Sequence, residues 1–273
     1  VEDRLRLLKS LKDEINLNEE HIYEALEIDL KKPRFETYAT EIGFLLNEIE
    51  LFIKKLRSWS KPKGIRSALI NFPSKDYIIF EPYGKVLVIS PWNYPFQLAL
   101  LPAMSAFAAG NSVVLKPSEH TPNTSKLIKK IVEKVFPTEL MSVIEGDSKT
   151  ASKLLEKKWD YIFFTGSVKI GEIVAMAAAK NLTPYTLELG GKSPAIINKD
   201  IDLKLASKRI VWGKFLNSGQ TCVAPDYLVV HKSIKGALIK ELIKRIEKTI
   251  GKKLEKTEDF TEILNEKKFK RLV

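Results

Sequence analysis

The chain has 273 residues, of which 44% are hydrophobic and 29% are charged. These values are typical of a globular protein with one or two domains, and they exclude a disordered chain. With one cysteine and three scattered histidines, the sequence excludes internal disulfides and shows no zinc-ligand spacing. We therefore expect no metal site, and we expect a cytoplasmic protein whose thiol stays reduced.

The net charge of +11 raises the question of a nucleic-acid or anionic-membrane partner. The lysines are spread along the chain beside glutamates, without a basic module interleaved with aromatic residues. We therefore predict no nucleic-acid partner. The longest apolar stretch, 94–109, is interrupted and too short to span a bilayer, and we expect no secretory signal. The lysine-flanked apolar stripe of 234–250 is typical of a core-facing helix, and membrane association stays a weaker alternative.

Helical periodicity dominates the N-terminal part of the sequence. Leucine and isoleucine recur at helical spacing over 3–30, which predicts a helix that Pro33 ends. A second apolar face predicts a helix over 36–59. Prolines and a glycine make 60–74 a predicted loop, and 77–80 is predicted to be a short strand.

From residue 85 onwards, short apolar strands alternate with helical segments. The predicted strands cover 85–90, 112–115, 142–144, 161–164 and 186–189. The predicted helices cover 96–109, 125–136, 148–156 and 168–180. This alternation is typical of βαβ units, and strands that are apolar on both faces suit a sheet covered on both sides. The sequence therefore predicts an α/β fold with a Rossmann-type parallel sheet flanked by helices.

The alternation continues after Gly190-Gly191, which we interpret as a hinge into a second domain. Strands are predicted over 195–197 and 227–230, and helices over 203–216 and 234–250. Residues 259–273 resemble the start of a further helical unit. We therefore expect N-terminal helices and the sheet domain over 1–190, and the start of a second α/β domain over 191–273.

Residues that are unusual for strand ends gather where the predicted strands end. They are Trp92, Asn93, Lys116, Glu119, Thr165, Gly166, Ser167 and Glu188. In an open parallel sheet, ligands bind at the carboxyl ends of the strands. The common position of these residues therefore predicts a binding site at one edge of the sheet.

Two parts of this predicted binding site have both a ligand-binding and a purely structural interpretation. The turn at 165–167, with Gly171 in the following helix, suits a phosphate at a helix N-terminus. Alternatively, Ser167 is an ordinary helix N-cap. Lys116 and Glu119 suit the hydroxyl groups of a ribose, or they lie in a solvated turn.

A cysteine lies in the polar turn 217–222, which contains a glycine. That setting favours a reactive thiol at Cys222, although a lone cysteine is more often a small buried hydrophobic residue. Glu188 has a competing interpretation as the partner of a lysine. Asn93, which precedes a Tyr-Pro pair, has a competing interpretation as a residue that shapes a turn.

Five motifs resemble, in the same order, signatures of the aldehyde dehydrogenase superfamily. They are Pro91-Trp92-Asn93-Tyr94-Pro95, Lys116-Pro117-Ser118-Glu119, Phe164-Thr165-Gly166-Ser167, Leu187-Glu188-Leu189-Gly190-Gly191-Lys192 and Gly219-Gln220-Thr221-Cys222. The N-terminal helices, the stretch 72–90 and the segment 222–227 resemble the class 3 branch. That branch includes fatty-aldehyde and aromatic-aldehyde enzymes, and the resemblance covers essentially the whole chain.

The resemblance implies oxidation of a small-molecule aldehyde to a carboxylic acid with NAD or NADP, through a cysteine thioester. It makes Cys222 the nucleophile, Glu188 the general base that activates water, and Asn93 a hydrogen-bond donor to the alkoxide. The cofactor-binding residues that it implies are Trp92, Lys116, Glu119, Thr165, Gly166, Ser167, Gly171, Leu189 and Gly190.

The chains of this family run well past the cysteine motif, through the rest of a catalytic domain and a bridging strand used in oligomer formation. We therefore expect a truncated relative that forms a homodimer at full length. Two alternatives to hydrolytic oxidation stay open. The first is a relative that passes its acyl group to coenzyme A or reduces an acyl group, against which Glu188 argues. The second is a non-catalytic fragment that binds the cofactor.

Overall fold

Five parallel strands form the main sheet of the protein in the computed structural model, which describes residues 1–251 and 260–272. They are β3 (Lys85–Ile89), β4 (Ser112–Lys116), β5 (Met141–Val143), β6 (Tyr161–Gly166) and β7 (Tyr185–Leu189). Their order across the sheet is β5-β4-β3-β6-β7, so the direction of winding reverses between β3 and β6. The predicted strands of this region and the α/β class are confirmed.

Helices cover both faces of this sheet, because alternate strand residues face two separate cores. In β3, Val86 and Val88 belong to one core, and Leu87 belongs to the other. The first core is covered by α5 (Gln97–Ala108), α6 (Pro122–Val135) and the N-terminal helices. The second core is covered by α7 (Ser148–Leu155) and α8 (Val168–Ala179). The predicted coverage of both faces is therefore confirmed.

The predicted helix over 3–30 is divided in two. Its parts are α1 (Glu2–Leu17) and α2 (Glu19–Leu30). At the break, the side-chain amide of Asn18 donates to the backbone oxygen of Glu14 at 2.9 Å and to its carboxylate at 2.8 Å. A side chain that satisfies the last carbonyl groups of a helix ends it, and the periodicity of leucines on either side does not reveal this.

The predicted helix over 36–59 is present, but its first part is not a regular α-helix. It starts as α3 (Arg34–Thr37), continues as a π-helical turn η1 (Tyr38–Ile42) and ends as α4 (Gly43–Trp59). Gly43 allows this packing, since a Cβ atom there would lie 3.1 Å from the backbone oxygen of Tyr38. Such turns occur frequently at functional sites, and this one carries the buried Glu41.

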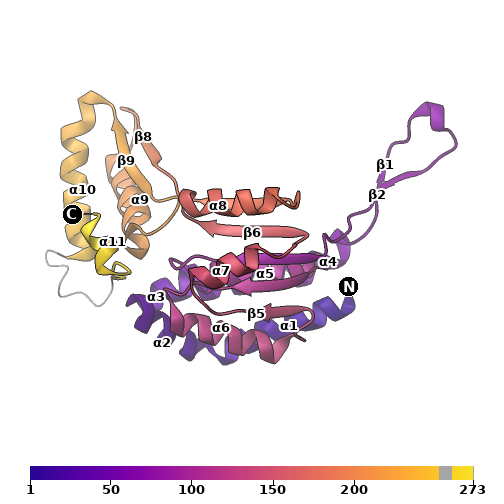
Figure 1. The fold of residues 1–273 in the computed structure, drawn as a ribbon. Coiled ribbons are helices and arrows are strands. Elements are labelled where there is room, and N and C mark those ends of the chain that lie inside the picture. Colours follow the sequence, from indigo (N-terminus) through magenta and orange to yellow (C-terminus); the bar gives the residue numbers. More distant parts are fainter. Residues whose placement is uncertain (252–259, 273) are drawn as a thin grey trace.

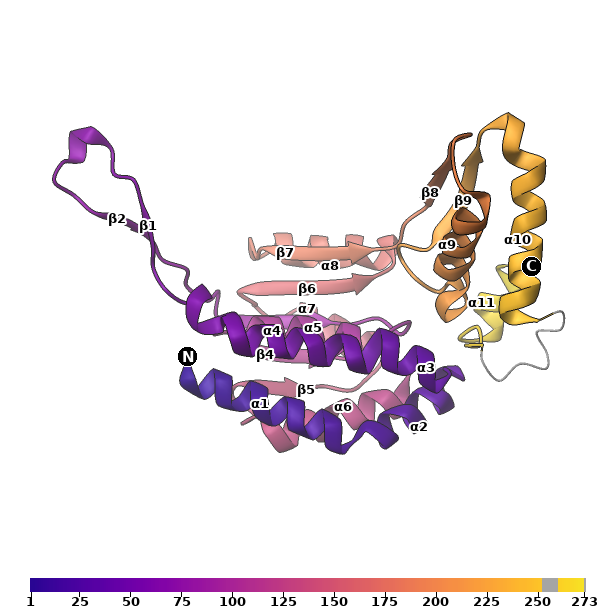
Figure 2. The ribbon, with the colours of Figure 1, turned by 180° about the vertical axis from the view of Figure 1, so that it is seen from behind.

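A β-hairpin projects from the body of the protein (Figures 1 and 2). It consists of β1 (Lys63–Ile65) and β2 (Asp76–Ile78), which pair antiparallel around the 3₁₀ turn η2 (Leu69–Asn71). The predicted loop over 60–74 and strand over 77–80 are therefore wrong in detail. Three-residue strands are too short to show an alternating pattern, so the sequence does not reveal them.

A second, two-stranded parallel sheet follows the first. It contains β8 (Ser193–Ile197) and β9 (Pro225–Val230), with α9 (Leu203–Phe215) between them. The 3₁₀ turn η3 (Leu216–Gly219) precedes β9, and the short turn η4 (Lys232–Ile234) follows it. The predicted strands and helix of this region are confirmed.

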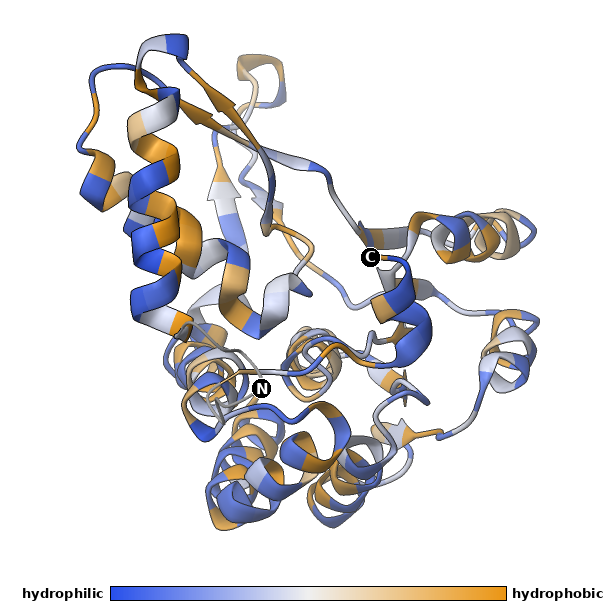
Figure 3. Ribbon diagram, turned by 90° about the vertical axis from the view of Figure 1, so that its left-hand side faces the viewer, coloured by the Kyte–Doolittle hydropathy of each residue, from blue (hydrophilic) through white to orange (hydrophobic). Residues whose placement is uncertain are grey.

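The last described elements are α10 (Lys235–Ile250) and the short helix α11 (Glu266–Lys270). Leu238 and Ile250 of α10 are buried, which confirms its core-facing stripe, and hydrophobic and hydrophilic residues alternate along the helices in Figure 3. Of the predicted helical unit over 259–273, residues 259 and 273 lie outside the described residues. Within 1–251 and 260–272, no helix has the length and apolarity that crossing a membrane requires.

Candidate functional site

The carboxyl ends of four neighbouring strands bring the predicted binding residues to one edge of the sheet. Trp92 and Asn93 follow β3, and Lys116 is the last residue of β4. On β6 and β7, Thr165 pairs in register with Glu188, and Gly166 pairs with Leu189. This edge includes the point between β3 and β6 where the winding reverses, which is where an open sheet leaves a crevice for ligands.

Lys116 and Glu119 form an ion pair at this edge. The amino group of Lys116 lies 2.8 Å from the Glu119 carboxylate, and the side chain of Lys116 is only 3% exposed. Burial raises the pKa of Glu119, but the hydrogen bond and charge of Lys116 outweigh it, so the pKa lies below its ordinary value. Lys116 is thus not part of a solvated turn. The pair presents an ammonium and an ionised carboxylate side by side, which suits hydroxyl groups that both donate and accept.

The turn at 165–167 leads directly into α8. Ser167 occupies the N-cap position, but its side chain makes no capping hydrogen bond. The ordinary N-cap interpretation therefore does not describe this serine. Gly171 lets α8 approach the sheet, because a Cβ atom at this position would lie 2.8 Å from a methyl group of Leu189. The first amide groups of α8 thus face the same edge as the Lys116 pair, a suitable position for a phosphate.

Cys222 is exposed and follows a strained turn. Asn217 and Ser218 both have positive φ angles, 53° and 54°, although neither is a glycine. Such conformations persist only where the surroundings impose them. Asn217 is fully buried, and its side-chain amide donates to the backbone oxygen of Asn93 at 2.9 Å. The interpretation of Cys222 as a buried hydrophobic residue is wrong.

Asn93 is joined directly to the turn that carries the cysteine. Its side-chain amide donates to the backbone oxygen of Gln220 at 2.9 Å, two residues before Cys222. Asn93 and the turn therefore hold each other from both sides, through this bond and the one from Asn217. This geometry gives Asn93 a role in shaping the turn. Within 1–251 and 260–272 the other amide hydrogen of Asn93 has no acceptor, so it is available for a second one.

Glu188 lies exposed on β7, at the border of the five-stranded sheet. Within the described part of the chain its carboxylate has no hydrogen bond and no ion pair, so the predicted lysine partner is not found there. The segment after β7 passes close to the cysteine, since a Cβ atom on Gly191 would lie 3.0 Å from the backbone oxygen of Cys222. The fold thus brings the end of the Glu188 strand to the turn that carries Cys222.

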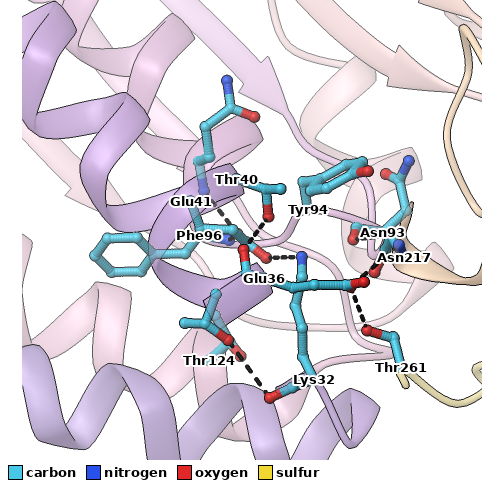
Figure 4. Close-up of polar contacts among 12 residues, drawn as sticks. Lys32, Glu36, Thr40, Glu41, Asn93, Tyr94, Phe96, Thr124, Asn217 and Thr261 are labelled. Atoms are coloured by element: carbon cyan, nitrogen blue, oxygen red, sulfur yellow. Dashed lines mark hydrogen bonds and ion pairs between the residues drawn. The ribbon is translucent and has the colours of Figure 1, made fainter. Parts of the chain in front are cut away.

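Sequence reasoning does not identify several of the residues around the turn that carries Cys222. A buried network joins the helical turn η1 to the cysteine region, with Lys32, Glu36, Glu41, Tyr94 and Thr261 among its members (Figure 4). A carboxylate oxygen of Glu36 accepts from the backbone N–H of Asn217 at 3.1 Å and from the Thr261 hydroxyl at 2.7 Å. Burial raises the pKa of Glu36, while these hydrogen bonds oppose the rise. Charged side chains are usually solvated, so no sequence signal distinguishes Glu36, Glu41 and Lys32 from the other charged residues around them.

The last described segment also reaches the site. The side chain of Gln220 donates to the backbone oxygen of Glu262 at 3.0 Å and accepts from the amide of Leu264 at 3.0 Å. The amino group of Lys268 lies 4.8 Å from the ring centroid of Trp92. Residues beyond α10 therefore contribute to the edge where the cofactor-binding residues are predicted. No cluster of three or more potential metal ligands occurs in 1–251 or 260–272.

Comparison with known proteins matches the whole chain to a single family. The model of the aldehyde dehydrogenase family matches residues 1–273. The family 3 aldehyde dehydrogenase comG of Dictyostelium discoideum is 44% identical over 100% of this chain and 58% of its own length. The dimeric NADP-preferring aldehyde dehydrogenase of Canis lupus familiaris is 40% identical over 99% of this chain and 60% of its own length.

A solved structure shows the same fold. It is the substrate-bound state of Staphylococcus aureus AldH, with a TM-score of 0.96 and 46% identity. The match covers 98% of this chain and 59% of that one. The chain thus spans about three-fifths of the length of the curated relatives it matches.

Proposed function

The chain belongs to the aldehyde dehydrogenase family, and we propose that it carries the nucleophile and cofactor site of an enzyme that oxidises an aldehyde to a carboxylic acid. The observation that carries the proposal is the bond between the Asn93 side chain and the backbone of Gln220, at 2.9 Å. It joins an amide donor to the turn of an exposed thiol, Cys222. The bond thereby keeps Cys222, the proposed nucleophile, close to Asn93, the proposed donor to the oxyanion.

In the proposed reaction, the sulfur of Cys222 attacks the aldehyde carbon and the carbonyl oxygen becomes an alkoxide. The second amide hydrogen of Asn93 and the backbone N–H of Cys222 stabilise that charge. Loss of hydride from the same carbon leaves a thioester on Cys222. Because the cysteine and Asn93 come from segments 127 residues apart that bond to each other, the donor is in place before the substrate binds.

The residues at the sheet edge fit an NAD or NADP cofactor. Lys116 and Glu119 offer a donor and an acceptor to a ribose, and the start of α8 offers amides to a phosphate. Ser90, which bonds to the Lys116 backbone, has a buried hydroxyl without a partner in the described part of the chain. Buried polar atoms are normally satisfied, so this hydroxyl suits a bound polar group. When bound, the nicotinamide supplies the acceptor for the hydride.

The remaining predicted contacts to the cofactor are Trp92, Thr165, Gly166, Ser167, Gly171, Leu189 and Gly190. We propose that all of them belong to a first domain over 1–190, and that 191–273 is the start of the catalytic domain. The separate sheets on either side of Gly190-Gly191 support this division. A cytoplasmic location, which keeps the single thiol reduced, is part of the same proposal.

Glu188 is the proposed general base that activates water to hydrolyse the thioester. We expect Glu188→Gln to lower steady-state turnover by roughly 10²-fold or more while the first, single turnover of cofactor reduction persists. Rapid-mixing absorbance measurements separate the two phases. Glu172→Gln, which changes an exposed carboxylate on α8, is the matched control and should leave both phases unaltered. Loss of the first turnover in Glu188→Gln would instead assign Glu188 to cofactor binding or folding.

The direct test of the function is the formation of reduced nicotinamide by the 273-residue chain with NAD or NADP and a medium-chain aldehyde. Production of free carboxylic acid supports hydrolytic oxidation. Production of acyl-coenzyme A, when coenzyme A is added, supports the acyl-transferring alternative. Cofactor binding without any turnover supports the non-catalytic alternative. That alternative stays open because the chain matches only about three-fifths of the length of its relatives.

We further propose that the β1–β2 hairpin forms a homodimer contact within this chain, in addition to the bridging strand expected at full length. The name of the canine relative supports the dimeric state itself. Ile70 at the tip of the hairpin is 91% exposed and is flanked by exposed Leu69 and Phe72, an apolar surface typical of an interface. We expect light scattering to give twice the 31.0 kDa chain mass, and Ile70→Asp to shift it to the monomer. Leu182→Asp is the control, because Leu182 is also 91% exposed but lies outside the hairpin. A dimer that persists in Ile70→Asp would contradict this interface.

A further inference from the structure

A buried ion pair anchors the segment that carries Asn93. The amino group of Lys32 lies 2.5 Å from one carboxylate oxygen of Glu41, and both side chains are fully buried. The other carboxylate oxygen of Glu41 accepts from the backbone amides of Phe96 and Gln97, at 2.9 and 3.1 Å. These amides lie at the start of α5, where the N–H groups have no acceptor within the helix itself. Glu41 thus fixes the chain directly after Asn93-Tyr94.

The same lysine also supports the ring of Tyr94. Its amino group lies 4.2 Å from the centroid of the Tyr94 ring, within the range of a cation–π contact. In Figure 4 the amino group of Lys32 lies between the carboxylate of Glu41 and the ring of Tyr94. The ring is itself buried, at 8% exposure. The ion pair therefore contacts the ring of Tyr94 and also holds the backbone two and three residues after it, at Phe96 and Gln97.

The hydroxyl of Tyr94 reaches the nucleophile turn. It lies 2.5 Å from the side-chain hydroxyl of Thr221, the residue before Cys222. Burial raises the pKa of Tyr94 to about 12, so its hydroxyl is protonated at neutral pH and can either donate or accept. The general base and the oxyanion donor proposed above do not require this hydroxyl. Its short bond to the turn therefore needs a separate explanation.

We infer that Tyr94 is a positioning residue for Cys222: its hydroxyl holds Thr221, and the buried pair of Lys32 and Glu41 holds Tyr94. The inference rests on the proposed function, in which Cys222 is the nucleophile. Asn93 bonds to the backbone of Gln220 and Tyr94 bonds to the side chain of Thr221. Two consecutive residues thus hold two consecutive residues of the turn, which fixes the thiol relative to the amide of Asn93.

Two reactions of the single thiol test this role without a cofactor. In the first, Cys222 attacks the carbonyl carbon of 4-nitrophenyl acetate, a C–S bond forms, the ester C–O bond breaks and 4-nitrophenolate leaves. Its tetrahedral intermediate carries an oxyanion that needs Asn93 in position. In the second, Cys222 displaces iodide from iodoacetamide, and no oxyanion forms. Because Cys222 is the only cysteine, both rates report on one atom.

We expect Tyr94→Phe to slow acylation by about tenfold, the order expected for one lost hydrogen bond, and to change alkylation by less than about twofold. Thr221→Val should have the same effect, and the double variant should be no slower than either single variant. Tyr161→Phe is the matched control, because its hydroxyl bonds to that of Thr186 at 2.6 Å, away from the turn. It should alter neither reaction.

The outcomes separate the inference from the proposed function. Acylation of Tyr94→Phe within about twofold of the unchanged chain would overturn the positioning role alone. An equal loss of acylation and alkylation would overturn it as well, since that would indicate a damaged fold or an altered thiol ionisation. If the unchanged chain shows no acylation beyond that of Cys222→Ser, the proposed function fails, and the positioning role fails with it.

Discussion

Replacing Cys222 by serine is expected to abolish cofactor-dependent aldehyde oxidation by the chain, with a loss on the order of 10³-fold or more. The thiolate is the nucleophile in the proposed mechanism, and a serine hydroxyl without an activating base is a far weaker one. Absorbance of the reduced nicotinamide measures the loss. The substitution changes one exposed atom, so the fold and the cofactor site should stay intact.

The control for this experiment is cofactor binding by the same variant. Titration with NAD should give equal dissociation constants for the unchanged chain and for Cys222→Ser, because the predicted cofactor residues lie outside the turn that carries Cys222. Oxidation that continues near the original rate in the serine variant would contradict the assignment of the nucleophile. Equal and complete absence of oxidation in both chains, with NAD still bound, would favour the non-catalytic alternative.

The largest expected effect on stability comes from the buried ion pair. We expect Lys32→Met to destabilise the protein by about 3–5 kcal/mol, because it leaves the carboxylate of Glu41 buried without its partner. Both side chains are fully buried in the structure, so water cannot replace the lost ammonium. Denaturation by urea, followed by circular dichroism, measures the change in the free energy of unfolding.

An exposed pair provides the comparison. Arg57 lies 2.7 Å from Glu2, but these side chains are 65% and 71% exposed. Arg57→Met should therefore change the free energy of unfolding by no more than about 1 kcal/mol. If Lys32→Met proves as harmless as Arg57→Met, the buried pair does not anchor the fold. That result would also remove the support that we infer for the ring of Tyr94.

The sequence by itself determined the main sheet and its class. The strands β3 and β4 are near-continuous apolar runs, and such runs separated by helical segments have few alternatives to a parallel sheet covered on both faces. Because the strands of such a sheet run in one direction, their carboxyl ends share one edge. The gathering of Lys116 and Thr165 at this edge therefore followed from the strand assignments alone.

Local features with weak sequence signals were not predictable. The break at Asn18 depends on one side-chain amide that satisfies the end of α1, and the leucine periodicity continues across it. The projecting hairpin consists of strands of three residues each, too short to show a period. The predictions depend on hydrophobic periodicity. That periodicity shows neither a helix end made by a side-chain hydrogen bond nor a strand of three residues.

The environment of Cys222, the proposed nucleophile, was decided only by the tertiary structure. The motif identifies Cys222 and Asn93, but the bond between Tyr94 and Thr221 joins residues 127 positions apart. Lys32, in the loop between α2 and α3, and Glu41, in η1, have the charge of ordinary surface residues, yet both side chains are fully buried. Whether a charged side chain is buried depends on which neighbouring elements pack against it, and the local sequence does not show this. The sequence therefore indicated the residues that we propose to react, and the packing of the N-terminal helices against α5 determined what surrounds them.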